Sequence, residues 1–491
     1  MPPKYFRPQA SKPSGHLEQS DTSTKETKKL QTASRGLTAL SGPTPRSPQS
    51  HIAIAGAGLV GSLLAIYLKK RGYRVSIFER RPDMRKKGYE GGRSINLALS
   101  NRGIRPLEEI GLAETLKQEA IPMHGRMIHD LHGNLNFQAY GKEGEYINSI
   151  SRSGLNKVLM SKAESLGAEF HFEQKIIGAD STSTTLNIEY PTVGAQQLPF
   201  DLIIGSDGAF SAVRLSMQQM DRFDFSQDYI DHGYKELHIS KGEAGGFQLE
   251  KNALHIWPRE SFMLIALPNP DGSFTLTLFF PFNGDASFSK LTTEETITAF
   301  FKNIFPDAYA LMPDLLSQFS QNPASSLVTV HCYPWVKNKT LLIGDAAHAI
   351  VPFYGQGMNA GFEDCRILNL LLDQYHDNWE KVLPAFQEQR KPDTDAIAKL
   401  ALDNFIEMRD LVNDAEFILR KKIEAKLYEL FPDRWIPLYS MVTFREDIRY
   451  SAAYATGQKQ KKIMEEVLKT PGIEKTWLTL DFERIANQLI S

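Results

Sequence analysis

A glycine-rich turn near residue 56 restricts the possible folds more than any other stretch of the sequence. An apolar run leads into Gly56-x-Gly58-x-x-Gly61, a helical stretch and a second apolar run follow, and Glu79 ends that run. In this arrangement the first glycine allows a tight turn, the second lets the backbone approach a pyrophosphate, and the third lets the helix pack on the strand. A carboxylate at the position of Glu79 can bind a ribose hydroxyl. The pattern therefore predicts an α/β unit that binds a dinucleotide.

Two later segments have the same character. At 341–365 a short apolar run precedes Gly344-Asp345, and a loop rich in proline and glycine leads to a predicted helix. At 201–214 an apolar run ends in Gly-Ser-Asp207-Gly. The N-terminus of a helix carries a partial positive charge and unpaired N–H groups, which suit an anionic ligand. We expect both segments to contact the same dinucleotide as the first turn.

Composition argues against several other classes of protein. The net charge is -2, so nothing indicates a nucleic-acid partner. Cys332 and Cys365 are the only cysteines, and the 12 histidines show no clustered spacing. We therefore expect a reducing cytosol, no disulfide framework and no metal. Residues 52–68 carry no charge and could mimic a membrane span, but their glycines and the basic cluster that follows favour the nucleotide turn.

The chain of 491 residues is too long for one simple core, and its pattern changes along its length. Residues 1–50 are rich in Ser, Thr, Lys, Gln and Pro and predict a disordered extension, with a transit peptide as the alternative. Residues 51–214 and 325–375 predict a discontinuous, Rossmann-like nucleotide-binding domain of the α/β class. Residues 215–324 alternate between apolar and polar and predict an inserted, mainly antiparallel sheet that forms a substrate domain. Residues 376–491 predict a helical region that closes the substrate pocket.

Three motifs together resemble the fingerprints of the FAD-dependent single-component aromatic hydroxylases, which share the p-hydroxybenzoate hydroxylase fold. They are GAGLVG at 56–61, DGAFSAVR at 207–214 and GDAAHAIVPFYGQGMNAGFED at 344–364. Further stretches, among them NFIEMRDLV and IPLYSMVTF, are similar to the kynurenine 3-monooxygenase family in particular. The resemblance extends from residue 51 to residue 455, which is nearly all of the predicted folded chain.

This resemblance implies an enzyme that hydroxylates L-kynurenine to 3-hydroxy-L-kynurenine with NADPH and O2, in tryptophan degradation and NAD biosynthesis. In that family reduced FAD reacts with oxygen to give a C4a-hydroperoxide, while the protein positions the substrate and excludes water. The aromatic amine of kynurenine activates its own ring, so no residue is assigned as an acid or base catalyst. His348 is expected to belong to the loop scaffold.

The resemblance also implies which residues bind the substrate. Arg126 and Tyr140 would hold the amino acid carboxylate, Arg126 through a charge-assisted contact of the kind that arginine can make in a bidentate way. Glu407 and Met408 share the helix face of Asn404. The complete predicted substrate set is Arg126, Tyr140, Asn404, Tyr439, Glu407, Met408, Phe353 and Gln356. Taken alone, the tyrosines would be ordinary packing residues, and Arg126 would pair with a local carboxylate.

The predicted FAD contacts fall in the glycine turns and beside them. Glu79 would bind the adenosine ribose, with Arg80 or Arg81 near the adenine, and Asp345 would bind the ribityl or pyrophosphate region. An arginine at a helix start is unfavourable, which favours a nearby anion as its partner, although taken alone Arg152 would be a surface arginine. It matches a family arginine at the FAD, so the resemblance implies that Arg152 contacts the cofactor. The complete set, with Met358 and Asn359 against the flavin ring, is Gly56, Gly58, Val60, Gly61, Phe78, Glu79, Arg80, Arg81, Ala98, Arg152, Ile176, Asp207, Asp345, Gly357, Met358 and Asn359.

Two features depart from the family. Animal members carry a hydrophobic C-terminal membrane anchor, whereas this chain ends in the polar stretch IANQLIS, which implies a soluble cytoplasmic enzyme of the bacterial kind. We separately expect a monomer or a homodimer. The N-terminal extension is not part of the family pattern. Two alternatives remain open at this point: a related hydroxylase that acts on another aromatic acid, and a flavin-binding module that does not turn over.

Overall fold

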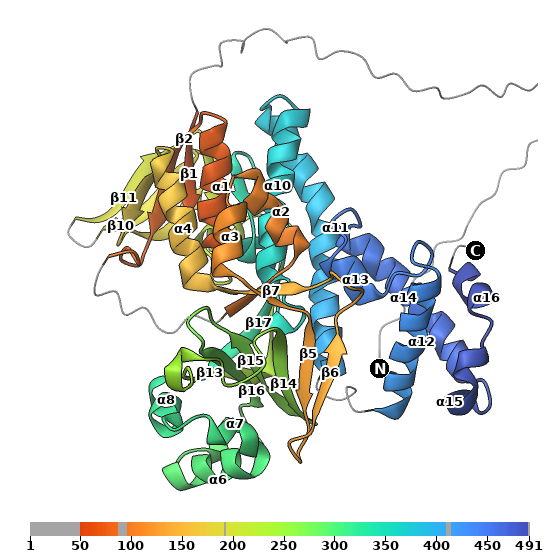
Figure 1. Cartoon of the computed structure of the whole chain (residues 1–491). Helices are drawn as coiled ribbons and strands as arrows, with labels where there is room; N and C mark the ends of the chain where they lie inside the picture. Colours follow the sequence, from red (N-terminus) through yellow and green to blue (C-terminus); the bar gives the residue numbers. More distant parts are fainter. Residues whose placement is uncertain (1–49, 87–95, 191–192, 409–413, 490–491) are drawn as a thin grey trace, which may run out of the picture. The chain divides into compact units, whose positions relative to one another are not determined.

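The structure is a computed structural model, and it describes residues 50–86, 96–190, 193–408 and 414–489 (Figure 1). All of them belong to one unit, Pro48–Ser491. The predicted disordered extension lies almost entirely outside the described residues.

A six-stranded sheet with the order β18-β19-β12-β1-β2-β8 forms the predicted nucleotide-binding part. Its strands are β1 (His51–Ala55), β2 (Arg74–Glu79), β8 (Glu169–Phe172), β12 (Leu202–Gly205), β18 (Val336–Lys337) and β19 (Thr340–Leu342). All neighbouring strands are parallel except β18 and β19. The helix α1 (Leu59–Lys70) packs against α4 (Arg152–Ser165) and α10 (Gly357–Gln374). Parallel strands covered by helices form continuous apolar runs, which is why the sequence predicts them well. The uncharged stretch 52–68 therefore forms a strand and most of a helix of this α/β layer.

Two small sheets lie beside this layer. One has the order β11-β10-β9, with β9 (Lys175–Asp180), β10 (Thr185–Tyr190) and β11 (Gly194–Pro199). The other has the order β3-β7-β4, with β3 (Asn96–Leu99), β4 (Ile121–Met123) and β7 (Ile147–Ser151). Three helices belong to the same part of the chain: α2 (Asn101–Glu109), α3 (Ala113–Glu119) and α5 (Ala212–Met217).

A seven-stranded sheet follows the order β17-β13-β16-β15-β14-β5-β6. Its strands are β5 (Gly125–His129), β6 (Leu135–Ala139), β13 (Asp224–Ile239), β14 (Ala253–Arg259), β15 (Phe262–Pro268), β16 (Phe274–Pro281) and β17 (Ser325–Tyr333). It is antiparallel apart from the parallel pair β5–β14, so the predicted mainly antiparallel sheet is present. However, β5, β6 and β17 come from segments that the sequence placed in the other domain, because alternation shows that a strand exists but not which strand it joins. The predicted domain boundaries stay a prediction.

The two faces of this sheet have different partners. One face packs on α6 (Glu294–Ile304), α7 (Pro306–Ala310) and α8 (Leu315–Gln321), through a core that includes Trp257 and Phe301. The other face, with Ile128 and Phe279, packs against Phe353 and against α11 (Trp379–Ile406). Arg126 and Ile128 are two positions apart on β5, so Arg126 points toward this second face.

The predicted C-terminal helices are present and follow α10. After α11 come α12 (Ala415–Leu430), α13 (Leu438–Thr443), α14 (Tyr450–Leu468), α15 (Ile473–Thr476) and α16 (Phe482–Asn487). α14 packs along α11 and α13. In Figure 1 the β5–β6 hairpin (orange) lies on the side of the sheet that faces these helices (blue). Among the described helices, none combines the length and the apolar character needed to cross a membrane.

Candidate functional site

Four turns meet at one edge of the six-stranded sheet. Gly56 follows β1, Glu79 ends β2, Asp207 comes shortly after β12, and Asp345 begins the short helix α9 (Asp345–His348) after β19. These four strands are adjacent and parallel, so their carboxyl ends lie side by side. Ligands of open α/β sheets bind in the crevice outside such ends. The structure therefore brings together the three segments that were predicted to share one ligand.

The glycines of the first turn differ in what a side chain would meet. Gly56 has a φ of +94°, and a Cβ there would lie 2.8 Å from the carbonyl oxygen of Ser206. A Cβ on Gly61 would lie 2.1 Å from the carbonyl oxygen of Gly56. A Cβ on Gly58 would meet no atom within 4 Å. The chain itself requires Gly56 and Gly61, whereas Gly58 leaves the open space that a closely approaching phosphate needs.

Val60, which lies at the start of α1, packs against the segment around Gly344 that follows β19. A Cβ on Gly344 would lie 3.1 Å from Val60, and a Cβ on Gly361 would lie 2.6 Å from it. Gly344 also has a φ of +59°, in the left-handed region. Two glycines thus let α9 and α10 pack on the start of α1, so the side chain of Val60 contributes to the packing of the cradle.

The acidic side chains of the edge are held in different ways. The Glu79 carboxylate accepts hydrogen bonds from the backbone N–H of Ala57 at 3.1 Å and of Arg81 at 2.9 Å. Asp207 Oδ2 accepts from the backbone N–H of Ala212 at 2.7 Å, while its Oδ1 is buried without a hydrogen-bond partner. Burial raises the pKa of Asp207. The Asp345 side chain is exposed although its neighbours are buried, which leaves its carboxylate accessible at the crevice.

Arg152 is the first residue of α4, and its side chain is exposed. Among the described residues no carboxylate forms an ion pair with Arg152. The guanidinium is therefore available to an anionic ligand, as its position at the helix start predicts. Asn156 lies one helical turn later and donates from Nδ2 to the carbonyl oxygen of Ala57 at 3.1 Å. Its Oδ1 is buried without a partner. No motif indicated Asn156, although its i, i+4 spacing from Arg152 places both residues on one helix face.

Two predicted cofactor residues have side chains that the protein core already uses. Phe78 is 2% exposed and stacks on His171 with ring centroids 4.7 Å apart. Asn359 is fully buried, accepts from the backbone N–H of Ser100 at 3.0 Å, and donates to the carbonyl oxygens of Ala98 and Gly355. These side chains position β2, β3 and the loop before α10, and the predicted contacts of both residues with a cofactor stay predictions.

The remaining predicted cofactor residues surround the same edge. Arg80 and Arg81 are exposed just after β2, and the carbonyl oxygen of Arg81 accepts from the backbone N–H of Glu173, shortly before Ile176 on β9. At the other end of the crevice, Gly357 and Met358 begin α10 and are partly exposed.

The predicted substrate residues form a second group, on the face of the seven-stranded sheet that packs against α11. The rings of Tyr140 and Tyr439 stack with centroids 5.3 Å apart, and Tyr354 also stacks on Tyr439, with centroids 5.6 Å apart. The Arg126 guanidinium lies 5.6 Å from the Tyr140 ring centroid and 5.2 Å from that of Tyr439. Residues from β5, the loop after β6, the segment before α10 and α13 thus meet at one place.

Among the described residues no carboxylate forms an ion pair with Arg126. Its Nε is buried without a hydrogen bond, and so is the hydroxyl of Tyr140. Burial alone would lower the pKa of Arg126, but its neighbours Tyr439 and Tyr140 raise it above the ordinary value, so the guanidinium stays charged. A buried, unpaired donor is costly. This pair of unsatisfied groups fits a carboxylate ligand.

The other predicted substrate residues lie around this group. Asn404 donates from Nδ2 to the carbonyl oxygen of Phe353 at 2.6 Å and to the sulfur of Met408 at 3.2 Å, as their shared helix face predicts. Glu407 forms an ion pair with Lys421 at 3.5 Å, and its electrostatic interaction with Arg126 raises the pKa of that arginine. Phe353 stacks on Phe405 with centroids 4.2 Å apart.

Gln356 differs from the rest of the substrate set. It is 2% exposed, and its Oε1 accepts a hydrogen bond from the Tyr450 hydroxyl at 2.8 Å. Its side chain therefore links the loop to α14.

His348 lies in a buried ionic network. Its Nε2 is 2.6 Å from Asp364 Oδ2, and Arg390 bonds the other oxygen of Asp364 at 2.7 Å. Arg390 and Arg102 each pair with Glu363 at 2.7 Å. This arrangement supports the predicted scaffold role of His348. The network itself was not predicted, because its members lie far apart in the sequence.

The comparisons with known proteins agree with this geometry. Residues 49–400 match the family described as an FAD binding domain. The chain is 50% identical over 441 residues to kynurenine 3-monooxygenase of Flavobacterium johnsoniae, a match that covers 89% of this chain and 98% of that protein. It is 49% identical over 444 residues to the Christiangramia forsetii protein of the same name, with 90% and 99% covered. The chain belongs to the kynurenine 3-monooxygenase family.

A solved structure shows the same fold. The tetrameric form of 2-methyl-3-hydroxypyridine-5-carboxylic acid oxygenase superposes with a TM-score of 0.62 at 21% identity, and the match covers 78% of this chain and 98% of that one. The predicted fold class and the predicted resemblance to the kynurenine 3-monooxygenase family are thus confirmed. The individual site residues stay predictions.

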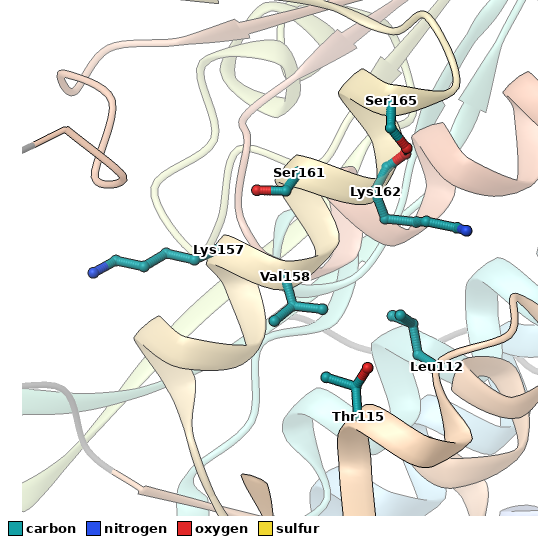
Figure 2. Close-up of a pocket in the computed structure, with 7 residues that line it drawn as sticks. All are labelled: Leu112, Thr115, Lys157, Val158, Ser161, Lys162 and Ser165. Carbon is teal, nitrogen blue, oxygen red and sulfur yellow. The ribbon is translucent and has the colours of Figure 1, made fainter. Parts of the chain in front are cut away.

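A surface hollow of about 510 Å³ lies apart from this family site, between α3 and α4 (Figure 2). Its lining residues are Leu112, Thr115, Lys157, Val158, Ser161, Lys162 and Ser165. In Figure 2 the Lys157 side chain points away from Leu112 and Thr115. The hollow shares no residue with the predicted cofactor or substrate sets.

The open space at Gly58 leads to a testable prediction for cofactor binding. Gly58→Ala is expected to weaken FAD binding about tenfold, because the added methyl group occupies the space that the pyrophosphate needs. The φ of Gly58 is -73° and its Cβ would meet no atom within 4 Å, so the FAD-free protein should lose less than about 1 kcal/mol of stability. Flavin fluorescence titration measures the first quantity and urea unfolding the second. Unchanged FAD affinity would contradict the assignment of this turn.

Proposed function

We propose that this protein is an FAD-dependent monooxygenase that hydroxylates L-kynurenine to 3-hydroxy-L-kynurenine with NADPH and O2. The observation that carries the proposal is the buried, unpaired Nε of Arg126 beside the equally unpaired hydroxyl of Tyr140. A carboxylate between them would satisfy both groups. Family relatives named kynurenine 3-monooxygenase, similar over nearly their whole length, support kynurenine as the acid that is bound.

The cofactor edge fits FAD. Gly58 leaves the space for a pyrophosphate, Arg152 would neutralise it, and the Glu79 carboxylate would bind the adenosine ribose. The unpaired Oδ1 of Asp207 and the exposed carboxylate of Asp345 would bind hydroxyl groups of the cofactor. Bound FAD would supply the transfer of electrons from NADPH and the activation of oxygen.

The protein residues orient kynurenine and keep water away from it. Arg126 would hold the carboxylate by charge-assisted hydrogen bonds, and Tyr140 would donate a further one. Burial raises the pKa of Tyr140 and of Tyr439, so both hydroxyls keep their protons and remain donors. Phe353 and Tyr354 cover the apolar side of the pocket. Because the aromatic amine of kynurenine already enriches its ring, these residues do not need to supply a catalytic base.

A comparison of substrates tests this function. L-kynurenine is expected to accelerate NADPH oxidation by the FAD-loaded protein, whereas salicylate and simple phenols, which lack the amino acid carboxylate, should not. NADPH consumption is followed by absorbance in the presence of each compound. Stimulation by the phenols but not by kynurenine would instead support a hydroxylase for another aromatic acid. Binding of FAD without stimulation by any substrate would contradict the proposed enzyme.

A further inference from the structure

Glu145 joins two regions of the chain that carry substrate residues. It lies in the loop between β6 and β7, shortly after Tyr140. Its Oε1 accepts a hydrogen bond from the Tyr428 hydroxyl of α12 at 3.0 Å, and its Oε2 accepts one from the Ser440 hydroxyl of α13 at 3.2 Å. Ser440 is the neighbour of Tyr439. A single carboxylate therefore links the loop that follows Tyr140 to the helix that carries Tyr439.

The local geometry holds this carboxylate in place. Oε2 also accepts from the backbone N–H of Lys142 at 3.0 Å. A Cβ on Gly141 would lie only 1.8 Å from Oε2, so the carboxylate packs directly over the glycine backbone. The ammonium group of Lys142 lies 4.3 Å from the centroid of the Tyr428 ring. The loop thus contacts both the hydroxyl and the ring face of Tyr428.

The two side chains that donate hydrogen bonds to Glu145 are buried. Tyr428 is 7% exposed and Ser440 is 1% exposed. Burial, and then the neighbouring Glu145, raise the pKa of Tyr428, so its hydroxyl keeps its proton and donates. Hydrogen bonds to a charged acceptor are roughly twice as strong as neutral ones. In the described part of the chain, Glu145 is the carboxylate that bonds both α12 and α13.

We propose that Glu145 is a positioning residue of the substrate pocket, which holds α12 and α13 against the loop after Tyr140 and so fixes the stacked rings of Tyr140 and Tyr439. The inference rests on the proposed function. Arg126 lies beside both rings, so their spacing determines the shape of its carboxylate site. Without Glu145 the helices would sample positions in which the two rings separate. The pocket would then bind kynurenine less well and admit water.

Three variants test this role. Glu145→Ala is expected to raise the dissociation constant of kynurenine about tenfold, because the fraction of molecules with an assembled pocket falls to about a tenth. The amount of hydroxylated product formed per NADPH consumed should also fall, since water that enters the pocket diverts the reaction to hydrogen peroxide. Glu145→Gln, which keeps an acceptor oxygen without the charge, should lie between Glu145→Ala and the unaltered protein. Tyr428→Phe should weaken binding in the unaltered protein but add little to Glu145→Ala.

Controls separate positioning from general damage. Glu143, exposed in the same loop, provides the matched variant Glu143→Ala, which should leave binding and product yield unchanged. FAD content and thermal unfolding are measured for every variant. If Glu145→Ala does not fold, Glu145→Gln and Tyr428→Phe provide the same test. Unchanged kynurenine affinity and yield in the Glu145 variants, or an equal loss in Glu143→Ala, would overturn the proposal. Affinity is read from flavin absorbance without turnover, so absence of product from the unaltered protein would contradict the proposed function alone.

Discussion

Arg126→Ala is expected to weaken kynurenine binding by about 2–3 kcal/mol, the scale of a lost charged hydrogen bond. This corresponds to roughly a 30- to 150-fold higher dissociation constant. The reason is that Arg126 has no described carboxylate partner, and its buried Nε is left for the ligand. Arg126→Lys should recover only part of the affinity, because an ammonium group cannot make the bidentate contact of a guanidinium. Titration of the flavin spectrum with kynurenine gives the dissociation constants.

A second ligand isolates the carboxylate contact. The decarboxylated analogue of kynurenine should bind equally to Arg126→Ala and to the unaltered protein, since it lacks the group that Arg126 holds. Arg105→Ala is the matched control, because Arg105 is about half exposed and its ion pairs with other described residues are long surface contacts. Unchanged kynurenine affinity in Arg126→Ala would remove Arg126 from the substrate site. An equal loss for both ligands would show that the arginine shapes the pocket without binding the carboxylate.

The second large effect concerns stability. Arg390→Met is expected to lower the free energy of unfolding by about 3–5 kcal/mol, because it leaves buried carboxylates without their partner. Arg390 is 2% exposed and bonds Asp364, Glu363 and the backbone of Ala360. Although burial alone would raise the pKa of Asp364, its contacts with His348 and Arg390 hold that pKa below its ordinary value, so this carboxylate is ionised at neutral pH. Urea unfolding measures the loss.

A double variant identifies its cause. Asp364→Asn in the Arg390→Met background should restore part of the lost stability, because it removes one of the stranded charges. Lys469→Ala breaks an exposed ion pair with Glu466 and should cause no measurable change. If Arg390→Met unfolds at the same urea concentration as the unaltered protein, the network does not stabilise the fold. If the double variant is less stable still, packing rather than charge explains the loss.

The parts of the site that could be predicted are those encoded by local chemistry. The backbone at Gly56 has a left-handed φ, and a Cβ at Gly61 would clash with the carbonyl oxygen of Gly56. Both positions therefore require glycine, and the short motif Gly-x-Gly-x-x-Gly reveals this in the sequence. The central parallel strands β1, β12 and β19 are buried along nearly their whole length and therefore form clear apolar runs. Likewise, the spacing of Asn404 and Met408 placed them on one helix face, where they are in contact.

The parts that could not be predicted depend on contacts between distant segments. No local pattern shows that β5 joins β14, that Arg390 meets Glu363, or that Glu145 reaches α12 and α13. The side chains of Phe78 and Asn359 lie inside motifs that suggest ligand contact, yet the core uses both. A motif thus predicts a binding edge without distinguishing the residues that would touch a ligand from those that would support them. The cytoplasmic location and the oligomeric state stay predictions.

Oxygen incorporation tests the central proposal most directly. The FAD-loaded protein is incubated with NADPH, L-kynurenine and ¹⁸O₂, and the product is analysed by mass spectrometry. We predict 3-hydroxy-L-kynurenine that carries one atom of ¹⁸O, with the new hydroxyl beside the aromatic amine. Kynurenine recovered unchanged while NADPH is consumed, or a hydroxylated product whose oxygen comes from water, would contradict the proposed monooxygenase.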